Sequence, residues 1–448
     1  MLVTEKRAAF SLALIYAFRM LGLFMILPVF SLYANNFDGV TPLLTGLAIG
    51  IYGLTQGLFQ LPFGFLSDRF GRKKIIVLGL LIFAIGSIVA AEADSIYQVI
   101  GGRALQGLGA IAAVVMALAA DLTREEVRLR VMAFIGMSIG LSFMISMVMG
   151  PLLAARYGLS LLFWITAGLA LAGIAVVIFI TPQPRTQGFH RDTQLSLADV
   201  GQILKNTELQ RLDLGIFVLH LVLSATFVVF PLVLRDSLSI AEALHWKIYL
   251  PVFVLSVLGM VPLIIVAEKF GKTKSMFLLG IAIVLIAELG LAGATTYEWV
   301  FAMLVLFFTG FNFLEASLPT LVARIAPADM KGTAMGLFSC AQFFGAFSGG
   351  VIGGLLLASP SYSYGFLVLA GLLLVWWIVA VFMKTPQPVA SRVVSLKDME
   401  EEAVELFLKQ ASLIKGVQEV SVYTEDRVAY LKVEKPFDEQ ALKALLAR

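Results

Sequence analysis

A small set of ionisable and amide side chains lies inside long apolar runs of this sequence. They are Arg19, Gln56, Gln60, Arg103, His220, Asn312, Glu315 and Gln342. Charged groups are rare in membrane-spanning segments because lipid solvates them poorly, so each is a candidate for binding a polar solute or moving a proton. We expect Arg19 and Arg103, with His220 or an acid, to line a central polar cavity. The alternative is that these groups only hold neighbouring helices together.

The composition shows where these residues must lie. Of 448 residues, 59% are hydrophobic and 14% are charged, which excludes a typical soluble enzyme, a disordered chain and a nucleic-acid-binding protein. The net charge of +3 gives no reason to expect a nucleic-acid partner. Charge is concentrated in residues 391–448, which hold 20 of the 63 charged side chains. The sequence therefore predicts a membrane protein with a small soluble tail.

Charged and Gly/Pro-rich segments divide the apolar part into runs of about 20 residues, the length that crosses a bilayer. There are twelve: 10–34, 43–66, 75–93, 97–119, 131–154, 161–181, 213–234, 247–267, 275–293, 298–321, 332–357 and 363–384. Backbone polar groups must be satisfied internally in lipid, so we expect twelve transmembrane helices in an all-α membrane protein.

Basic residues between the runs predict the orientation. With the N-terminus inside, the inside loops hold 18 Lys and Arg, whereas the outside loops hold only Arg156, Arg235 and Lys247. Positive charge is retained on the cytoplasmic side, so both termini are predicted to be cytoplasmic.

An internal repeat with an offset of 200 divides the chain. Residues 62–73 and 262–273 share Pro, acid, base, Phe, Gly and base in register. We expect a six-helix half (1–181), a cytoplasmic connector (182–212), a second six-helix half (213–385) and a cytoplasmic domain (391–448). Two such halves can rock around a site at the membrane midplane.

Two motifs carry a family resemblance. The segment from Gly64 to Lys73, Gly-Phe-Leu-Ser-Asp-Arg-Phe-Gly-Arg-Lys, resembles the loop 2–3 signature of the major facilitator superfamily. The segment from Arg103 to Ala110 resembles that superfamily's Arg-x-x-Gln-Gly-x-Gly-Ala pattern, and Gly150-Pro151 matches only the end of its antiporter motif. The resemblance implies the major facilitator fold and secondary active transport.

The same resemblance implies a conformational latch that holds the two halves in the outward-open state. Its residues would be Gly64, Asp68, Arg69, Gly71, Arg72 and Asp121. We expect Asp68 to cap the helix that begins near residues 331–333, and Arg72 to reach Asp121. The alternative is a basic loop that only sets the topology.

The tail is predicted to form a strand (392–396), a helix (398–414), strands 417–423 and 427–434, and a helix (437–447). This is most of a ferredoxin-like β-α-β-β-α-β unit. The tail resembles heavy-metal-associated domains but lacks their Cys-x-x-Cys pair, and Cys340 is the one cysteine of the chain. We therefore expect no metal and no intrachain disulfide, and a tail that docks on the core or self-associates.

Together these features predict a multi-pass transporter of the bacterial inner membrane. The favoured function is proton-coupled efflux of a small organic solute by rocker-switch alternating access, with membrane lipids as surroundings. No cofactor is expected, and no enzyme activity either, since the apolar runs hold no compact nucleophile–base or metal constellation. No P-loop is present, so ATP drive is not expected, and the glycines of residues 345–354 indicate close helix packing or flexing. A uniporter or importer, or a membrane sensor that signals through its tail, remains an alternative.

Overall fold

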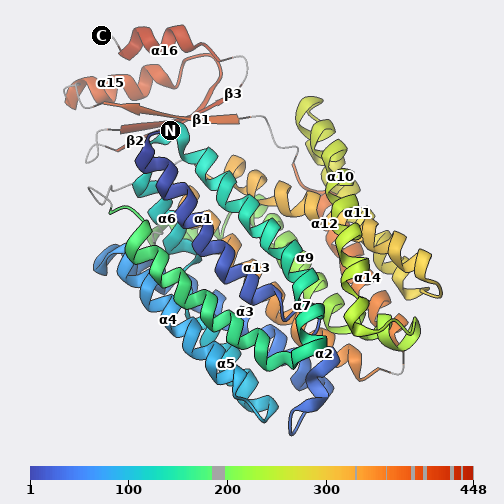
Figure 1. Ribbon diagram of the computed structural model, residues 1–448. Coiled ribbons are helices and arrows are strands. Elements are labelled where there is room, and N and C mark those ends of the chain that lie inside the picture. Colours follow the sequence, from blue (N-terminus) through green and yellow to red (C-terminus); the bar gives the residue numbers. More distant parts are fainter. Residues whose placement is uncertain are drawn as a thin grey trace.

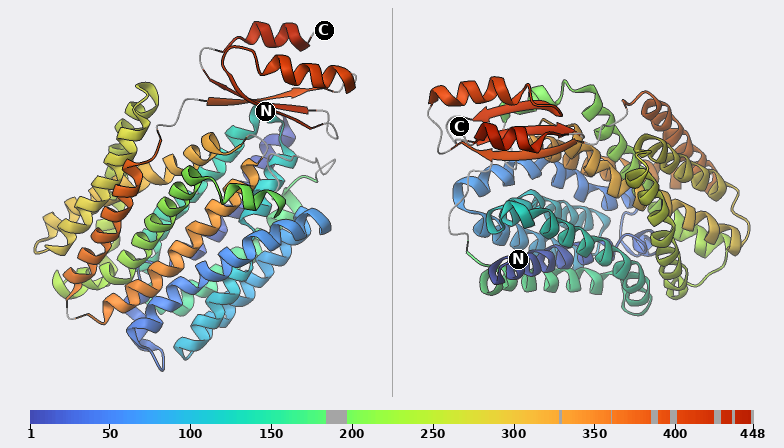
Figure 2. Two further views of the ribbon diagram at one scale, coloured as in Figure 1. Left: turned by 180° about the vertical axis from the view of Figure 1, so that it is seen from behind. Right: turned by 90° about the horizontal axis from the view of Figure 1, so that it is seen from above.

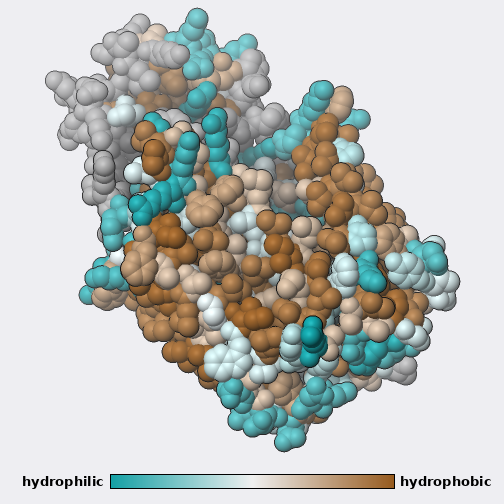
Figure 3. Space-filling view, viewed as in Figure 1, coloured by the Kyte–Doolittle hydropathy of each residue, from teal (hydrophilic) through white to brown (hydrophobic). Residues whose placement is uncertain are grey.

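The chain folds into a helical bundle with a small α/β unit at one end (Figure 1). The computed structural model describes residues 1–183, 197–327, 330–359, 361–384, 389–396, 401–423, 428–434 and 437–446. Within these residues, eleven helices are long and apolar enough to cross a membrane. Apolar side chains cover the flank of the bundle and polar ones gather towards its ends (Figure 3).

The first half is built from six long helices and one short one. They are α1 (Val3–Phe24), α2 (Phe30–Tyr33), α3 (Pro42–Phe70), α4 (Arg72–Ala91), α5 (Ile96–Leu108), α6 (Ala112–Leu122) and α7 (Glu125–Ala175). The second half contains α9 (Thr207–Leu232), α10 (Trp246–Lys269), α11 (Thr273–Ala292), α12 (Tyr297–Ile325), α13 (Lys331–Leu357) and α14 (Tyr362–Val381). Between them lies α8 (Leu197–Ile203), which falls within the predicted connector.

Helix α7 accounts for the difference between twelve predicted runs and eleven helices. Its 51 residues would extend about 76 Å if straight, far more than the roughly 30 Å core of a bilayer. The helix bends at Gly158, which has a positive φ of 76°. The first arm follows α1 in parallel, with hydrogen bonds from Ser138, Ser142 and Ser146 to the carbonyl oxygens of Ala13, Ala17 and Leu21.

The second arm of α7 returns antiparallel to α1. The Thr166 hydroxyl donates a hydrogen bond to the carbonyl oxygen of Gly22. Further along, Arg7 donates to the carbonyl oxygen of Ile180 at 2.6 Å. The two arms therefore cross in opposite directions, as the predicted runs 131–154 and 161–181 require.

The predicted run 97–119 lies within one candidate span, Ile96–Leu122, but this span is not one continuous helix. The helix breaks between α5 and α6. Here the backbone N–H of Ala110 donates a hydrogen bond to the carbonyl oxygen of Leu108, and that of Ile111 donates to the carbonyl oxygen of Gly109. Gly107 and Gly109 cause close packing here: a Cβ on either would overlap the backbone of α3 or α4.

The 200-residue repeat is visible in the backbone. Pro62 and Pro262 both lie inside a helix, in α3 and α10. Each helix is followed by a glycine with positive φ, 96° at Gly71 and 65° at Gly271. A residue with a Cβ rarely adopts this conformation, so the glycines permit the sharp turn into the next helix.

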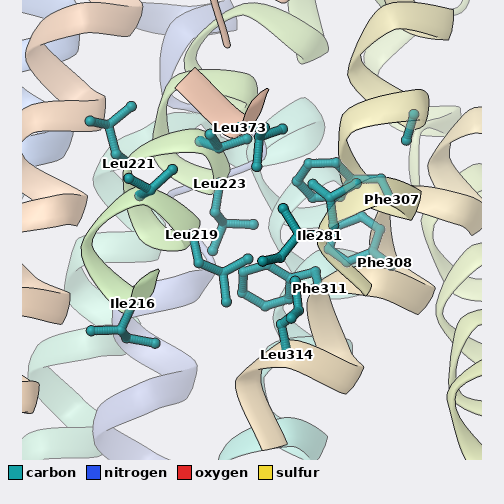
Figure 4. Close-up of a cluster of buried hydrophobic side chains, with 14 of the residues drawn as sticks. Ile216, Leu219, Leu221, Leu223, Ile281, Phe307, Phe308, Phe311, Leu314 and Leu373 are labelled. Atoms are coloured by element: carbon teal, nitrogen blue, oxygen red, sulfur yellow. The ribbon is translucent and has the colours of Figure 1, made fainter. Parts of the chain in front are cut away.

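Each half has its own apolar core. In the second half, aromatic and aliphatic side chains of α9, α11, α12 and α14 interdigitate, among them Leu219, Ile281, Phe308 and Leu373 (Figure 4). In the first half, one buried cluster joins α1, α4, α6 and α7, and a second joins residues 25–34 to α3, α4, α5 and α7.

The tail contains β1 (Val389–Ser395), α15 (Glu401–Ala411), β2 (Val417–Tyr423), β3 (Val428–Glu434) and α16 (Glu439–Leu446). Its sheet has the order β1-β3-β2, with both pairs antiparallel. Ala429 and Leu431 of β3 pack with Phe407 of α15 and Leu442 of α16. The tail lies beyond the end of the bundle that carries the N-terminus (Figures 1 and 2), which we call the N-terminal end. The opposite end, around residues 33–42, 92–96, 237–245 and 357–362, is called the far end.

Candidate functional site

Three predicted polar residues meet inside the second half. Gln342 of α13 places its Nε2 2.9 Å from Nε2 of His220 on α9, and donates to Oε1 of Glu315 on α12 at 3.1 Å. The His220 Nε2 and Glu315 Oε2 atoms are 3.8 Å apart. The two Nε2 atoms are within hydrogen-bond distance, and the direction of that bond depends on the tautomer of His220.

This cluster is only partly buried, since the His220 side chain is 14% exposed. The Glu315 side chain is 39% exposed although it lies in the interior of a membrane-spanning helix. Phe311, one turn earlier on α12, packs against the His220 ring with centroids 5.9 Å apart. Asn312 points to another neighbour, since it donates to Ser256 of α10 at 3.1 Å. Three of the four polar residues predicted in this half are thus brought together.

The polar residues of the first half form a separate network. Arg19 of α1 donates from Nη2 to Oε1 of Gln56 and, at 3.0 Å, to the carbonyl oxygen of Gly109 at the α5–α6 break. Gln56 in turn donates to Gln60 at 2.9 Å, one turn further along α3. The Arg19 side chain is 1% exposed, and its guanidinium carbon lies 6.0 Å and 5.7 Å from the ring centroids of Tyr52 and Phe83.

Arg103 ties α5 to α3. It donates to the carbonyl oxygens of Ala48 and Ile49 at 3.2 and 3.3 Å, and to Gln106 at 2.8 Å. It also stacks on Tyr52, 5.3 Å from the ring centroid. Arg19 and Arg103 are both buried within the first half, and no hydrogen bond or ion pair among the described residues links them to the His220 cluster.

The loop 2–3 motif forms an ionic cluster at the N-terminal end. Arg72, at the start of α4, pairs with Asp68 of α3 and with Asp121 of α6, the latter at 3.2 Å. Arg72 also donates to Ser67 at 2.6 Å, and Ser67 donates to the carbonyl oxygen of Gly64. The predicted contact between Arg72 and Asp121 is therefore present, whereas Arg69 instead stacks on its neighbour Phe70.

The two halves touch along α3 and α13, which run antiparallel. Gly46 and Gly50 of α3 face Gly350 and Gly354 of α13 so closely that a Cβ on any of them would overlap backbone of the other helix. Further along, the Cys340 thiol donates to the carbonyl oxygen of Gly57. The predicted close packing of the glycine-rich segment is confirmed.

Polar contacts join the halves at the far end. Tyr33, after α1, donates to Glu242 of the second half at 3.0 Å. Arg235 pairs with Glu242 at 3.8 Å and donates at 3.4 Å to the carbonyl oxygen of Leu32. Each half thus supplies a donor and an acceptor, and together with the glycine contacts they hold this end closed.

The sequence prediction missed Tyr33, Tyr52, Glu242 and the break after Gly109. It also missed Asp213 of α9, which lies two turns before His220 and on the same side of the helix. Two features of the sequence could have indicated Asp213 and the close packing of α3. The spacing of Asp213 and His220 is seven residues, and glycines recur at positions 46, 50, 53 and 57 of α3.

Comparison with known proteins agrees with this architecture. The "Inner membrane transport protein YajR" of Escherichia coli (strain K12) is 43% identical over 433 residues, which cover 96% of this chain and 94% of the relative. The "Multidrug resistance protein MdtH" of Aeromonas salmonicida (strain A449) is 27% identical over 75% of this chain and 84% of its own. These relatives are transporters, not enzymes.

Solved structures show the same fold. A bacterial homologue of the human lysosomal transporter Spinster aligns with a TM-score of 0.69 at 14% identity, covering 86% of this chain and 98% of that one. The human organic anion transporter MFSD10 aligns with a TM-score of 0.64 at 17% identity, covering 85% and 100%. The sequence profile of the Major Facilitator Superfamily matches residues 12–209 and 212–424. The predicted family is confirmed, and the chain belongs to the Major Facilitator Superfamily of membrane transporters.

Proposed function

We propose that this protein is a proton-coupled exporter of a small organic solute that works by rocker-switch alternating access. The observation that carries the proposal is the cluster of His220, Gln342 and Glu315. It joins two titratable groups from different helices, 3.8 Å apart, in a partly exposed position inside the membrane-spanning bundle.

Such a pair can exchange a proton for a polar solute. When Glu315 is ionised it attracts a proton or a cationic group, and when His220 is protonated the two form an ion pair. Gln342 contacts both partners, so a change at one alters the hydrogen bonding of the other. Asp213, two turns closer to the N-terminal end, provides a second carboxyl along the same side of α9.

Alternating access needs two ends that close in turn. The far end is closed here by the α3–α13 glycine contacts and by Tyr33, Arg235 and Glu242. The cluster of Asp68, Arg72 and Asp121 is the proposed latch for the opposite state, in which the N-terminal end closes. If the antiparallel register of α3 and α13 continues from Gly57 and Cys340, Asp68 reaches the start of α13 near Lys331.

The proposed arrangement in the cell is a bacterial inner membrane with both termini in the cytoplasm. It rests on the excess of basic residues at the N-terminal end. We propose the division into halves 1–181 and 213–385, connector 182–212 and domain 391–448, although α9 already begins at Thr207. The tail is proposed to be ferredoxin-like, since two helices pack on a three-stranded antiparallel sheet, and to dock on the core or self-associate.

Transport into inverted vesicles tests the proposal. Ethidium and carboxyfluorescein serve as a cationic and an anionic probe, and uptake is driven by a respiratory proton gradient. Uptake should collapse on addition of a protonophore, and Glu315→Gln should abolish it. Glu298→Gln, an exposed carboxylate on the same helix α12, is the matched control and should transport normally.

Three results would argue against this function. Uptake that survives the protonophore indicates a uniporter. Uptake that runs only in the opposite direction indicates an importer. Binding without flux, with a cellular phenotype that follows residues 391–448 alone, indicates a sensor.

A further inference from the structure

Two buried arginines of the first half, Arg19 and Arg103, have no acidic partner among the described residues. Arg19 and Arg103 are 1% and 4% exposed, and neither forms an ion pair with a described residue. Residues 1–183 contain eight acids, and all of them lie near helix ends: Glu5, Asp38, Asp68, Glu92, Asp94, Asp121, Glu125 and Glu126. Burying an uncompensated charge is strongly unfavourable. Two such buried arginines therefore suggest that a negatively charged ligand binds near them.

Arg19 also retains unused hydrogen-bond donors. A guanidinium has five N–H groups, and two of those of Arg19 are used by Gln56 and Gly109. Its Nε and Nη1 have no acceptor among the described residues. The hydroxyl of Tyr52, 4% exposed, is likewise without a partner there, and its ring lies beside both guanidinium groups.

The break between α5 and α6 adds a third element of the same sign. Helix α6 begins at Ala112 inside the bundle, and its first backbone N–H groups have no acceptor within the helix. The N-terminus of a helix carries partial positive charge and attracts anions. Arg19 is held at this break by its hydrogen bond to Gly109, and Tyr16 of α1 is held there by a bond to Ala112.

We infer that the α5–α6 break, Arg19 and Tyr52 form a binding site for a small monovalent anion. Free N–H groups of Arg19 and the Tyr52 hydroxyl would donate to it, and Arg103 and the N-terminus of α6 would add favourable charge. The anion would be either a halide that resides in the first half or the carboxylate of a transported solute. The site lies apart from the His220 cluster, so it does not depend on proton coupling.

Thermal unfolding of the full chain in detergent tests this site. The protein is kept in sodium HEPES, whose anion is much larger than chloride or acetate, and sodium chloride or sodium acetate is titrated at constant ionic strength. Wild-type protein should show a saturable rise of its unfolding midpoint, on the order of 2 °C. Arg19→Gln should lose the rise. Arg156→Gln, which removes the same charge from an exposed position at the far end, should keep it.

A second variant covers the case in which Arg19→Gln does not fold. Tyr52→Phe removes one donor while keeping the ring between the two guanidinium groups, and should weaken anion binding about fivefold. Protection by chloride and not acetate identifies a resident halide, and protection by acetate identifies a carboxylate ligand. The proposal is overturned if wild-type protein does not respond, or if Arg19→Gln or Tyr52→Phe responds as Arg156→Gln does.

Discussion

Gly46 of α3 and Gly350 of α13 belong to different halves of the protein, yet their backbones are in contact. A Cβ added to Gly46 would overlap the carbonyl oxygen of Gly350, and one added to Gly350 would overlap the backbone of Gly50. Backbone carbonyls cannot move aside as the end of a flexible side chain can. The closed state of the far end therefore requires glycine at these positions.

Gly46→Val should prevent closure of the far end. The added side chain has no space against Gly350, so we expect transport to slow by at least about tenfold, since each tenfold corresponds to only about 1.4 kcal/mol. Gly101→Val is the matched control, because a Cβ at Gly101 meets nothing within 4 Å. Equal transport by the two variants would show that α3 and α13 do not need to approach this closely.

Asp68→Asn should abolish transport and leave the protein in the membrane. The substitution removes the charge that pairs with Arg72 and keeps the size of the side chain. Asp94→Asn, at an exposed site of the far end, should transport normally. Solute flux in vesicles with equal protein content is the measurement, and wild-type flux in Asp68→Asn would refute the latch.

Because of the hydrogen bond between Tyr33 and Glu242, closure of the far end should weaken at high pH. Burial, and then the hydrogen bond to Glu242, raise the pKa of Tyr33 above its ordinary value of about 10. The closed state favours the protonated hydroxyl. Its contribution is therefore complete below pH 10 and is lost as the pH rises through the raised pKa of Tyr33.

Spin labels on Asn36→Cys and Ser239→Cys in a Cys340→Ala background report this closure. The distance between labels should stay constant from pH 6 to 9 and lengthen above about pH 10. Tyr33→Phe should shift the population towards the open far end about fivefold at neutral pH. It should also remove the rise in opening above pH 10, and a variant that keeps that rise would assign it to another group.

Glu288 of α11 should act as a structural acceptor. It is fully buried and accepts a hydrogen bond from Thr226 of α9 at 2.7 Å. Glu288→Gln keeps this acceptor and should transport at the wild-type rate. Glu288→Ala leaves the Thr226 hydroxyl unpaired and should lower the free energy of unfolding by about 1–3 kcal/mol. Loss of transport in Glu288→Gln with unchanged stability would instead place this carboxyl in the proton path.

Much of the membrane core could be predicted from the sequence, because lipid leaves few choices. An apolar run of about 20 residues in a bilayer must be a helix, so counting runs gave the helices and their order. The repeat gave the two halves, and its glycines at 71 and 271 have the positive φ that the turn needs. The contact of Arg72 with Asp121 also followed from the motif.

The grouping of the polar residues could not be predicted, because sequence spacing does not tell which side of a helix faces a neighbour. Arg19 and His220 were expected around one cavity. The structure instead places Arg19 against Gln56 and Gly109 in the first half, and His220 beside Gln342 and Glu315 in the second. The break at Gly109 was missed for a similar reason, since it depends on close packing against α3 and α4.

The amino-acid sequence by itself determined that this chain is a helical membrane protein and to which family it belongs. These properties depend on local hydropathy, on charge between the runs and on short motifs. Only the tertiary structure decided which charges share a site and which end of the bundle is closed. Those properties depend on how helices distant in the sequence rotate and pack, and a hydrogen bond of 3 Å such as that between Arg19 and Gly109 is set by this packing alone.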